Sequence, residues 1–311
     1  MKNLSAKQNI SFTDFELNGF NSLEEWRPFL FIPFFLMFIL SISANSTLIY
    51  LIVSQKSLHS PMYVLLCLLA IVDLIMPVLF VPSMLLNFLF NWTGISLTGC
   101  LTQMFCLHFV GTFQSTLLLW MALDRYFAIC KPLYYNKYME IRNFLKFVVV
   151  PLIRNALLII CLVILAGKLP FCVTNIIDHC FCEHMALVQL ACGDISINNL
   201  VGLLTAFLIP TADFILITAS YVVIFASVFK SGKAHGKAIN TCVTHFIVMS
   251  VSLTFALTAF LSYRVRNNFS PNSRIFVSTM YILFPSCFNP IIYGVRTKEI
   301  RQAFLKFMNT I

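Results

Sequence analysis

Seven long apolar stretches, separated by short polar segments, dominate the hydrophobic pattern of this chain. A helix needs about 20 mostly apolar residues to cross the hydrocarbon core of a bilayer, whereas the strands of a membrane barrel would alternate in segments of about ten residues. The stretches that are long enough run over residues 29–53, 62–90, 101–123, 147–167, 195–229, 238–263 and 275–295. The pattern therefore predicts an all-α fold, a bundle of seven transmembrane helices.

The composition agrees with a membrane location. The 311 residues are 59% hydrophobic and 11% charged, whereas an ordinary globular protein has about 25% charged residues. So few charges cannot cover a soluble surface, which excludes a soluble enzyme, a disordered chain and a nucleic-acid-binding protein. Inside the apolar stretches, a carboxylate such as Asp73 is costly and indicates function, while Arg154 and Asp213 are consistent with interhelical contacts or snorkelling.

Basic residues predict the orientation, because Lys and Arg concentrate in cytoplasmic segments. With the N-terminus outside, the inner segments carry a large excess of basic over acidic side chains, and the outer segments are balanced. We therefore expect an extracellular N-terminal tail (1–28), a transmembrane domain (29–295) and a cytoplasmic tail (296–311) with a short amphipathic helix after the seventh span. Sequons at Asn3 and Asn9 in the outer tail are candidate glycosylation sites.

The outer segments also hold five of the 11 cysteines: Cys100, Cys172, Cys180, Cys182 and Cys192. Disulfides are expected on the oxidising side of a membrane. The run from His179 to His184 includes Cys180, Cys182 and Glu183, which are residue types that bind zinc. The compartment favours disulfides with one spare thiol over a metal site, so we predict no metal and no cofactor.

Polar motifs mark three places in the helices. Asp124-Arg125-Tyr126 stands at the inner end of the third helix, where a local ion pair can open when a partner enters. Asn289-Pro290-Ile-Ile-Tyr293 lies near the inner end of the seventh, where proline removes a backbone hydrogen bond and permits a kink. Asn45, Asp73 and Asn289 can form one polar cluster between helices.

On these seven helices, the motifs resemble those of a rhodopsin-like G-protein-coupled receptor, and five segments narrow the resemblance to odorant receptors. They are Pro61-Met62-Tyr63, Met121 to Leu133, Ser220-Tyr221, Lys237 to His245, and Asn289 to Gly294. The sequences from Tyr293 to Arg301 and from His179 to His184 are similar to those of receptors in the fish-like, or class I, branch. Gln114 departs from the many members that carry glutamate there, which weakens a sodium site beside Asp73.

The resemblance implies a receptor that binds a small-molecule odorant in the outer half of the bundle. It would activate a stimulatory, olfactory-type heterotrimeric G protein, raise cyclic AMP, and reside in the plasma membrane of olfactory sensory cilia. Its partners would be the odorant, the G protein and the lipid bilayer, with no nucleic acid and no enzymatic activity. The implied coupling and switch residues are Asp124, Arg125, Tyr126, Tyr221, Lys237, Asn289, Pro290 and Tyr293, and the implied polar core is Asn45, Asp73 and Gln114.

The same resemblance implies two outer disulfides, Cys100–Cys182 and Cys172–Cys192, with Cys180 left over; Cys100–Cys192 is the main alternative. A pocket can also be sketched. The third helix offers one face with suitable spacing, and other positions come from the loop and the sixth and seventh helices. The candidate ligand residues are His108, Gly111, Thr112, Ser115, Met185, Phe260, Arg264 and Tyr281.

Two ligand hypotheses remain open at this stage. A small carboxylic acid could pair with Arg264, because a guanidinium matches a carboxylate, with His108 donating a second hydrogen bond. Alternatively, the ligand is neutral and Arg264 is structural. The seventh stretch has no lysine, which a retinal-binding receptor needs, so an opsin is excluded. The third stretch has no acidic residue, so a simple amine ligand would lack its usual counter-ion. A non-olfactory chemoreceptor of the same superfamily, or a transporter or channel, is the alternative function.

Overall fold

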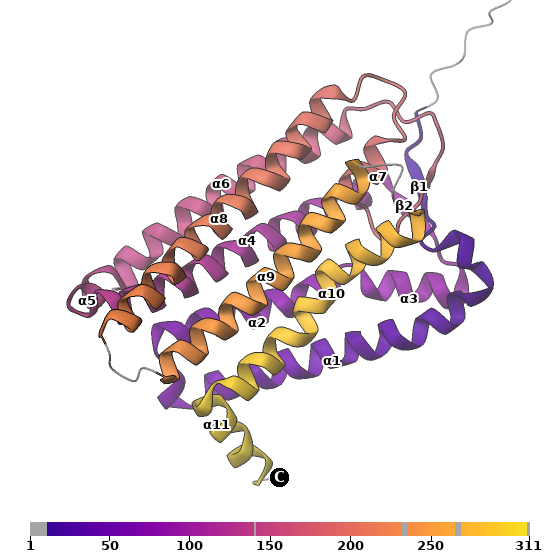
Figure 1. Cartoon of the computed structure of the whole chain (residues 1–311). Coiled ribbons are helices and arrows are strands. Elements are labelled where there is room, and N and C mark those ends of the chain that lie inside the picture. Colours follow the sequence, from indigo (N-terminus) through magenta and orange to yellow (C-terminus); the bar gives the residue numbers. More distant parts are fainter. Residues whose placement is uncertain (1–10, 140, 232–235, 265–268, 310–311) are drawn as a thin grey trace, which may run out of the picture.

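The computed structural model describes residues 11–139, 141–231, 236–264 and 269–309, which form an elongated helical bundle (Figure 1). The helices are α1 (Arg27–Ser54), α2 (Pro61–Val78), α3 (Val81–Phe90), α4 (Leu97–Cys130), α5 (Pro132–Met139), α6 (Ile141–Gly167), α7 (His184–Val188), α8 (Ser196–Ser231), α9 (Gly236–Arg264), α10 (Pro271–Arg296) and α11 (Lys298–Met308). Short 3₁₀ turns occupy Asn21–Trp26 and Lys56–Leu58. The strands are β1 (Asp14–Leu17), β2 (Gly94–Ser96) and β3 (Ile176–Ile177).

The prediction of seven membrane-spanning helices is confirmed. In the described part of the chain, seven helical segments are long and apolar enough to cross a membrane. Each corresponds to one predicted stretch. The stretches are helical because in lipid every backbone polar group must be satisfied within its own segment. The structure extends α4 beyond the predicted 101–123 at both ends, to Leu97–Cys130. The extra residues are more polar, so hydropathy alone did not include them.

The second predicted stretch, 62–90, is not one continuous helix. It breaks after Val78 and resumes at Val81. Pro82 lies in the first turn of α3, where its missing N–H cannot bond back into α2, and Phe80 leaves helical geometry (φ −140°, ψ −29°). The prediction of a single helix was therefore wrong in this detail, and the break redirects α3 relative to α2 (Figure 1).

A small sheet at one end of the bundle was not predicted. Strand β1 pairs antiparallel with β2 and parallel with β3, so the order is β2-β1-β3. Phe15 of β1 is buried and makes an edge-to-face contact with Phe171, with ring centroids 5.3 Å apart. We call this end of the bundle the sheet end. The segment predicted only as a tail is thus packed against the bundle from Phe12 onward.

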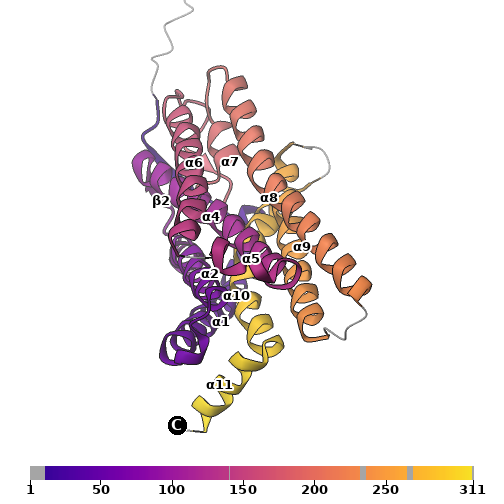
Figure 2. The ribbon, with the colours of Figure 1, turned by 90° about the vertical axis from the view of Figure 1, so that its left-hand side faces the viewer.

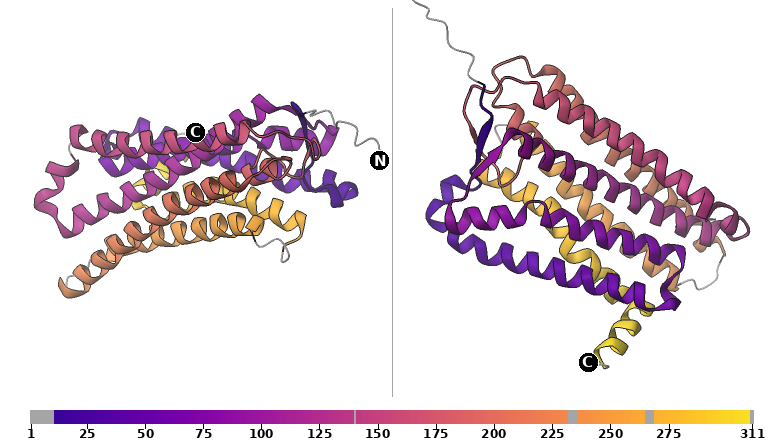
Figure 3. Two further views of the ribbon diagram at one scale, coloured as in Figure 1. Left: turned by 90° about the horizontal axis from the view of Figure 1, so that it is seen from above. Right: turned by 180° about the vertical axis from the view of Figure 1, so that it is seen from behind.

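Helices α5 and α11 lie at the opposite end, and Figure 2 shows α11 leaving the bundle there. The view from behind in Figure 3 places β1 and the C-terminus at opposite ends. Ile300 of α11 is buried in the main core, and Phe307 contacts the Tyr50 ring of α1 at 5.3 Å. Glu299 also hydrogen-bonds with Tyr63 at the start of α2. These contacts hold α11 across the ends of α1 and α2.

Candidate functional site

A cavity of ≈ 210 Å³ lies between α4, α6, α8, α9 and α10, under the loop that leads into α7. Most of its lining is apolar, as is usual for small-molecule sites. Seven of the eight candidate ligand residues line this one cavity: His108, Gly111, Thr112, Ser115, Met185, Phe260 and Tyr281. The structure thus brings together residues that are far apart in sequence, although their contact with a ligand stays a prediction.

Arg264 is the eighth candidate. It is the last residue of α9, but its side chain lies outside the described part of the structure. Its neighbour Tyr263 lines the cavity and is buried. The end of α9 therefore reaches the cavity, while the position of the Arg264 guanidinium stays a prediction.

Helix α4 forms one wall of the cavity. A Cβ atom at Gly111 would lie 3.3 Å from the hydroxyl oxygen of Tyr281, so glycine lets α10 approach this wall closely. Thr112 donates its hydroxyl to the carbonyl of Phe109 at 2.9 Å. One turn deeper, Ser115 donates to the carboxylate of Asp213 on α8 at 2.7 Å. No role could be assigned to Asp213 from the sequence. Its carboxylate thus fixes the hydroxyl of a serine that lines the cavity.

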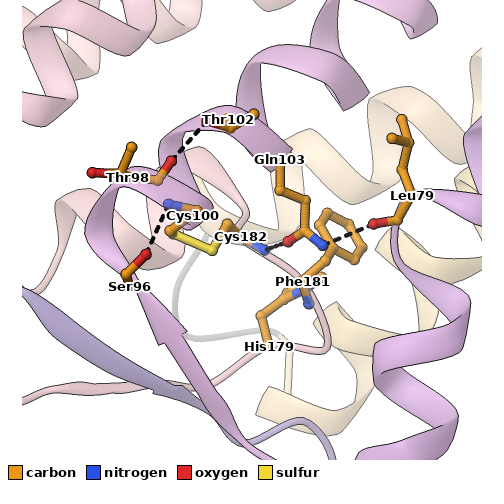
Figure 4. Close-up of a disulfide and its surroundings, with 10 residues drawn as sticks. Leu79, Ser96, Thr98, Cys100, Thr102, Gln103, His179, Phe181 and Cys182 are labelled. Carbon is orange, nitrogen blue, oxygen red and sulfur yellow. Dashed lines mark hydrogen bonds between the residues drawn. A yellow bond between two sulfur atoms is a disulfide. The ribbon is translucent and has the colours of Figure 1, made fainter.

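The loop over the cavity is anchored by the disulfide between Cys100 and Cys182, whose Cα atoms are 5.3 Å apart. Gln103 reinforces this anchor, as Figure 4 shows. Its amide oxygen accepts from the N–H of Cys182 at 2.8 Å, and its amide nitrogen donates to the carbonyl of Leu79 at 2.9 Å. The Leu79 carbonyl is available because α2 ends there. One side chain therefore ties the loop, α4 and the α2–α3 break together.

A second disulfide joins Cys172 to Cys192, with a Cα–Cα distance of 5.7 Å. This is the pairing that the resemblance implied, and the alternative Cys100–Cys192 is not formed. Cys180 is a buried free thiol, and burial raises its pKa well above the ordinary value. It is packed against the backbone of Gly19, at which a Cβ would clash with the Cys180 sulfur.

The loop brings two further residues to the cavity, Glu183 and His184. Glu183 caps α7 by accepting from the N–H of Ala186 at 2.7 Å. His179 is fully buried beside Phe181, and this burial lowers its pKa to about 3. Among the described residues, no group of three or more His, Cys, Asp or Glu side chains is arranged to hold a metal ion. Glu183 and His184 could not be predicted as pocket residues, because their spacing in a loop carries no periodic signal.

The polar core lies deeper, between α1, α2, α4 and α10. The Asp73 carboxylate accepts from the amide of Gln114 and, at 2.9 Å, from that of Asn289. Asn45 instead donates to the Ser286 carbonyl at 2.8 Å. Pro290, four residues after Ser286, has no N–H to offer that carbonyl. Asn45 therefore supplies the hydrogen bond that proline removes, and joins α1 to the part of α10 just before Pro290.

The end opposite the sheet holds the Asp124-Arg125-Tyr126 motif. The Arg125 guanidinium lies 3.3 Å from the Asp124 carboxylate, which is buried. Tyr135 of α5 donates its hydroxyl to the same carboxylate at 2.8 Å, a contact that the sequence analysis missed. Tyr221 and Tyr293 are also buried. The side chain of Lys237 lies outside the described part of the structure.

Comparisons with known proteins agree with this geometry. The fold is similar to that of squid rhodopsin, with a TM-score of 0.72 at 17% identity, covering 92% of this chain and 86% of that one. A model of the olfactory receptor family matches residues 34–310. Human olfactory receptor 52K2 is 39% identical over 305 residues, covering 96% of this chain and 97% of the relative. Human olfactory receptor 52N2 is 37% identical over 310 residues, covering 98% and 97%.

The fold is therefore a seven-helix bundle of the kind that squid rhodopsin has. The chain belongs to the olfactory receptor family. It is thus an odorant-sensing, non-enzymatic receptor of the plasma membrane that takes a small-molecule ligand and couples to a G protein. Its similarity to receptors of the 52 group agrees with the class I branch indicated by the sequence.

Proposed function

We propose that this receptor binds its odorant in the cavity beside α4 and activates a stimulatory, olfactory-type G protein that raises cyclic AMP. The observation that carries the proposal is the convergence of seven candidate residues, from α4, α7, α9 and α10, on one mostly apolar cavity. The Asp124–Arg125 pair lies at the opposite end of α4. Helix α4 therefore connects a ligand site to a coupling site, as a receptor with two conformational states requires.

The proposed orientation places the sheet end outside the cell. Two observations support it. Both disulfides lie at the sheet end, and disulfides persist in oxidising compartments. Basic side chains collect at the other end, on or next to α5 and α11, as expected for a cytoplasmic face: Lys131, Lys137, Arg296, Arg301 and Lys306. In this orientation Asn3 and Asn9, which lie outside the described residues, are the glycosylation sites, and α11 is cytoplasmic. We also propose that the receptor is carried to olfactory cilia.

The ligand we propose is a small carboxylic acid whose head group pairs with Arg264. The end of α9 reaches the cavity through Tyr263 and Phe260, which both line it. A guanidinium there offers two parallel donors to a carboxylate. The apolar lining suits a short aliphatic or aromatic tail. The apolar lining is also the observation that favours the second candidate, a neutral odorant with a structural Arg264.

The experiment compares acids with their methyl esters on cells that report cyclic AMP. A charge-assisted hydrogen bond contributes about 1.5–3 kcal/mol, or roughly ten- to a hundredfold in potency. Arg264→Ala should weaken an acidic agonist by that factor and leave its ester nearly unchanged. Arg266→Ala, two residues further along, is the matched control and should change neither. Equal losses for acid and ester would remove Arg264 as the counter-ion and favour the neutral odorant.

A further inference from the structure

The two hydroxyl groups on the α4 wall of the cavity can accept a hydrogen bond from a ligand but have no free hydrogen to donate to it. Ser115 lines the cavity, yet its hydrogen is donated away from it, to the Asp213 carboxylate at 2.7 Å. Thr112, one turn nearer the sheet end, also lines the cavity and donates to the Phe109 carbonyl at 2.9 Å. Each hydroxyl has a single hydrogen and two lone pairs. What both groups can present to a ligand is therefore an acceptor.

Surrounding groups hold Ser115 and Asp213 in this arrangement. Asp213 is 4% exposed, and Arg154 on α6 is the positive charge that acts on its carboxylate. The Arg154 guanidinium donates to the Asn155 side-chain oxygen at 3.0 and 3.1 Å. The Asn155 amide in turn donates to Thr116 and to the Thr112 carbonyl on α4, both at 3.3 Å. The three helices are thus cross-linked by polar contacts, and the Asp213 carboxylate is the acceptor of the Ser115 hydrogen.

Most of the cavity lining near Ser115 is apolar. The polar lining residues beside it on α4 are Thr112, whose hydroxyl is donated to its own helix, and Gln114, whose amide donates to Asp73. Leu118 follows Ser115 by one turn on α4, and Phe214 and Ile217 flank the same level on α8. A ligand group that reaches Ser115 therefore meets the serine's acceptor in a mostly apolar surrounding. A carbonyl, ether or carboxylate oxygen would bring its lone pairs against those of Ser115, and burying an unpaired polar group is costly. A hydroxyl or an N–H would complete the hydrogen bond.

We propose that the part of the odorant lying on α4 carries a hydrogen-bond donor, such as an alcohol hydroxyl, which Ser115 accepts. Asp213 is the positioning residue that sets this preference by holding the Ser115 hydrogen. The proposal rests on the proposed function, because it uses the same cavity. It adds that a carboxylate is bound away from Ser115, so that an acidic ligand whose second polar group reaches Ser115 would carry a donor there, as a hydroxy acid does.

Isomeric probes test the proposal without a known ligand. 1-Heptanol and hexyl methyl ether have the same formula, as do 1-nonanol and octyl methyl ether, so each pair differs in the donor and not in size. Binding is measured as the concentration that raises the thermal stability of the purified full-length receptor in lipid nanodiscs. The wild-type receptor should bind the alcohol about tenfold more tightly than its ether, as expected for one buried acceptor satisfied or left unpaired.

Two substitutions should change this ratio. Ser115→Ala should bring it close to one, with the loss falling on the alcohol. Asp213→Asn should also lower it, because the new amide can donate to Ser115 and turn the serine hydrogen toward the cavity, which favours the ether. Thr102→Ala is the control, since Thr102 is an exposed α4 residue that bonds to its own helix and does not line the cavity.

No preference for either alcohol over its ether in the wild type would overturn the proposal, as would a preference that survives Ser115→Ala. Loss of folding in Asp213→Asn leaves the Ser115→Ala comparison decisive. The binding measurement needs no G protein. An alcohol preference without a cyclic AMP response would refute the proposed coupling alone, and a cyclic AMP response without the preference would refute only the present proposal.

Discussion

In α4, the guanidinium of Arg125 lies 3.3 Å from the carboxylate of its neighbour Asp124, which is almost completely buried. The same carboxylate accepts the hydroxyl of Tyr135 from α5. This arrangement keeps Arg125 engaged within its own helix. In the proposed coupling, a G protein that binds Arg125 would compete with the pair, so we expect the contact to bias the receptor toward its inactive state.

The first prediction concerns Arg125 itself. Arg125→Ala should abolish agonist-evoked cyclic AMP while the receptor still reaches the cell surface, because the residue is about one-quarter exposed and carries little of the packing. Surface labelling and a cyclic AMP reporter measure the two effects in the same cells. Lys131→Ala, which removes a nearby exposed charge, should keep most of the response. Full signalling by Arg125→Ala at normal surface levels would refute its assignment to coupling.

The second prediction concerns Tyr135. Tyr135→Phe removes one hydrogen bond to Asp124 and little else. Such a bond contributes about 0.5–1.5 kcal/mol, so basal cyclic AMP should rise about two- to tenfold as the inactive state is weakened. Tyr134→Phe on the same short helix is the matched control. An unchanged basal level in Tyr135→Phe would show that the Asp124 contact does not restrain the receptor.

The third prediction concerns the loop over the cavity. The Cys172–Cys192 bridge closes a sequence separation of 20 residues, which contributes about 3 kcal/mol in the chain-entropy account. Cys100→Ser or Cys182→Ser should retain the receptor inside the cell, because each breaks the anchor on α4. Cys180→Ala should reach the surface, since this thiol forms no disulfide. Surface flow cytometry compares the three, and equal damage in Cys180→Ala would contradict the pairing.

The fourth prediction concerns the N-terminal strand. Phe15 is 1% exposed and packs against Phe171. Phe15→Ala should lower the free energy of unfolding by about 3–5 kcal/mol if the site does not collapse, seen as a clear fall in the thermal midpoint of the purified receptor. Phe12→Ala, at a partly buried position nearby, should cost much less. Equal midpoints for the two variants would mean that the strand is not packed as described.

The seven spans could be predicted because their evidence lies in the sequence itself: length and apolarity are sufficient where lipid forbids unpaired backbone. The break at Phe80 could have been suspected from Pro77 and Pro82, but both prolines lie in an unbroken apolar run. Strand β1 could not be predicted, because its partners β2 and β3 are short segments that are distant in sequence. Such pairing is decided by tertiary contacts and leaves little trace in local pattern.

Only part of the candidate site could be predicted from the sequence, for a similar reason. Residues on one face of α4 follow helical spacing, so His108, Thr112 and Ser115 could be grouped before the structure was known. The Ser115–Asp213 contact joins α4 to α8, and no spacing within one helix predicts it. Asn45 was expected beside Asp73, yet it bonds to the carbonyl that Pro290 leaves open. Which polar group it meets depends on how the helices pack.

The central claim is that one odorant-filled cavity controls a G protein at the far end of α4. The most direct measurement is cyclic AMP in cells that express the receptor, exposed to a panel of small acids, alcohols, hydroxy acids and their esters and ethers. The account predicts a dose-dependent rise with at least one member of the panel, abolished by Arg125→Ala and shifted to higher dose by Ser115→Ala. Ligand-independent ion or solute flux with no cyclic AMP response to any member would contradict it.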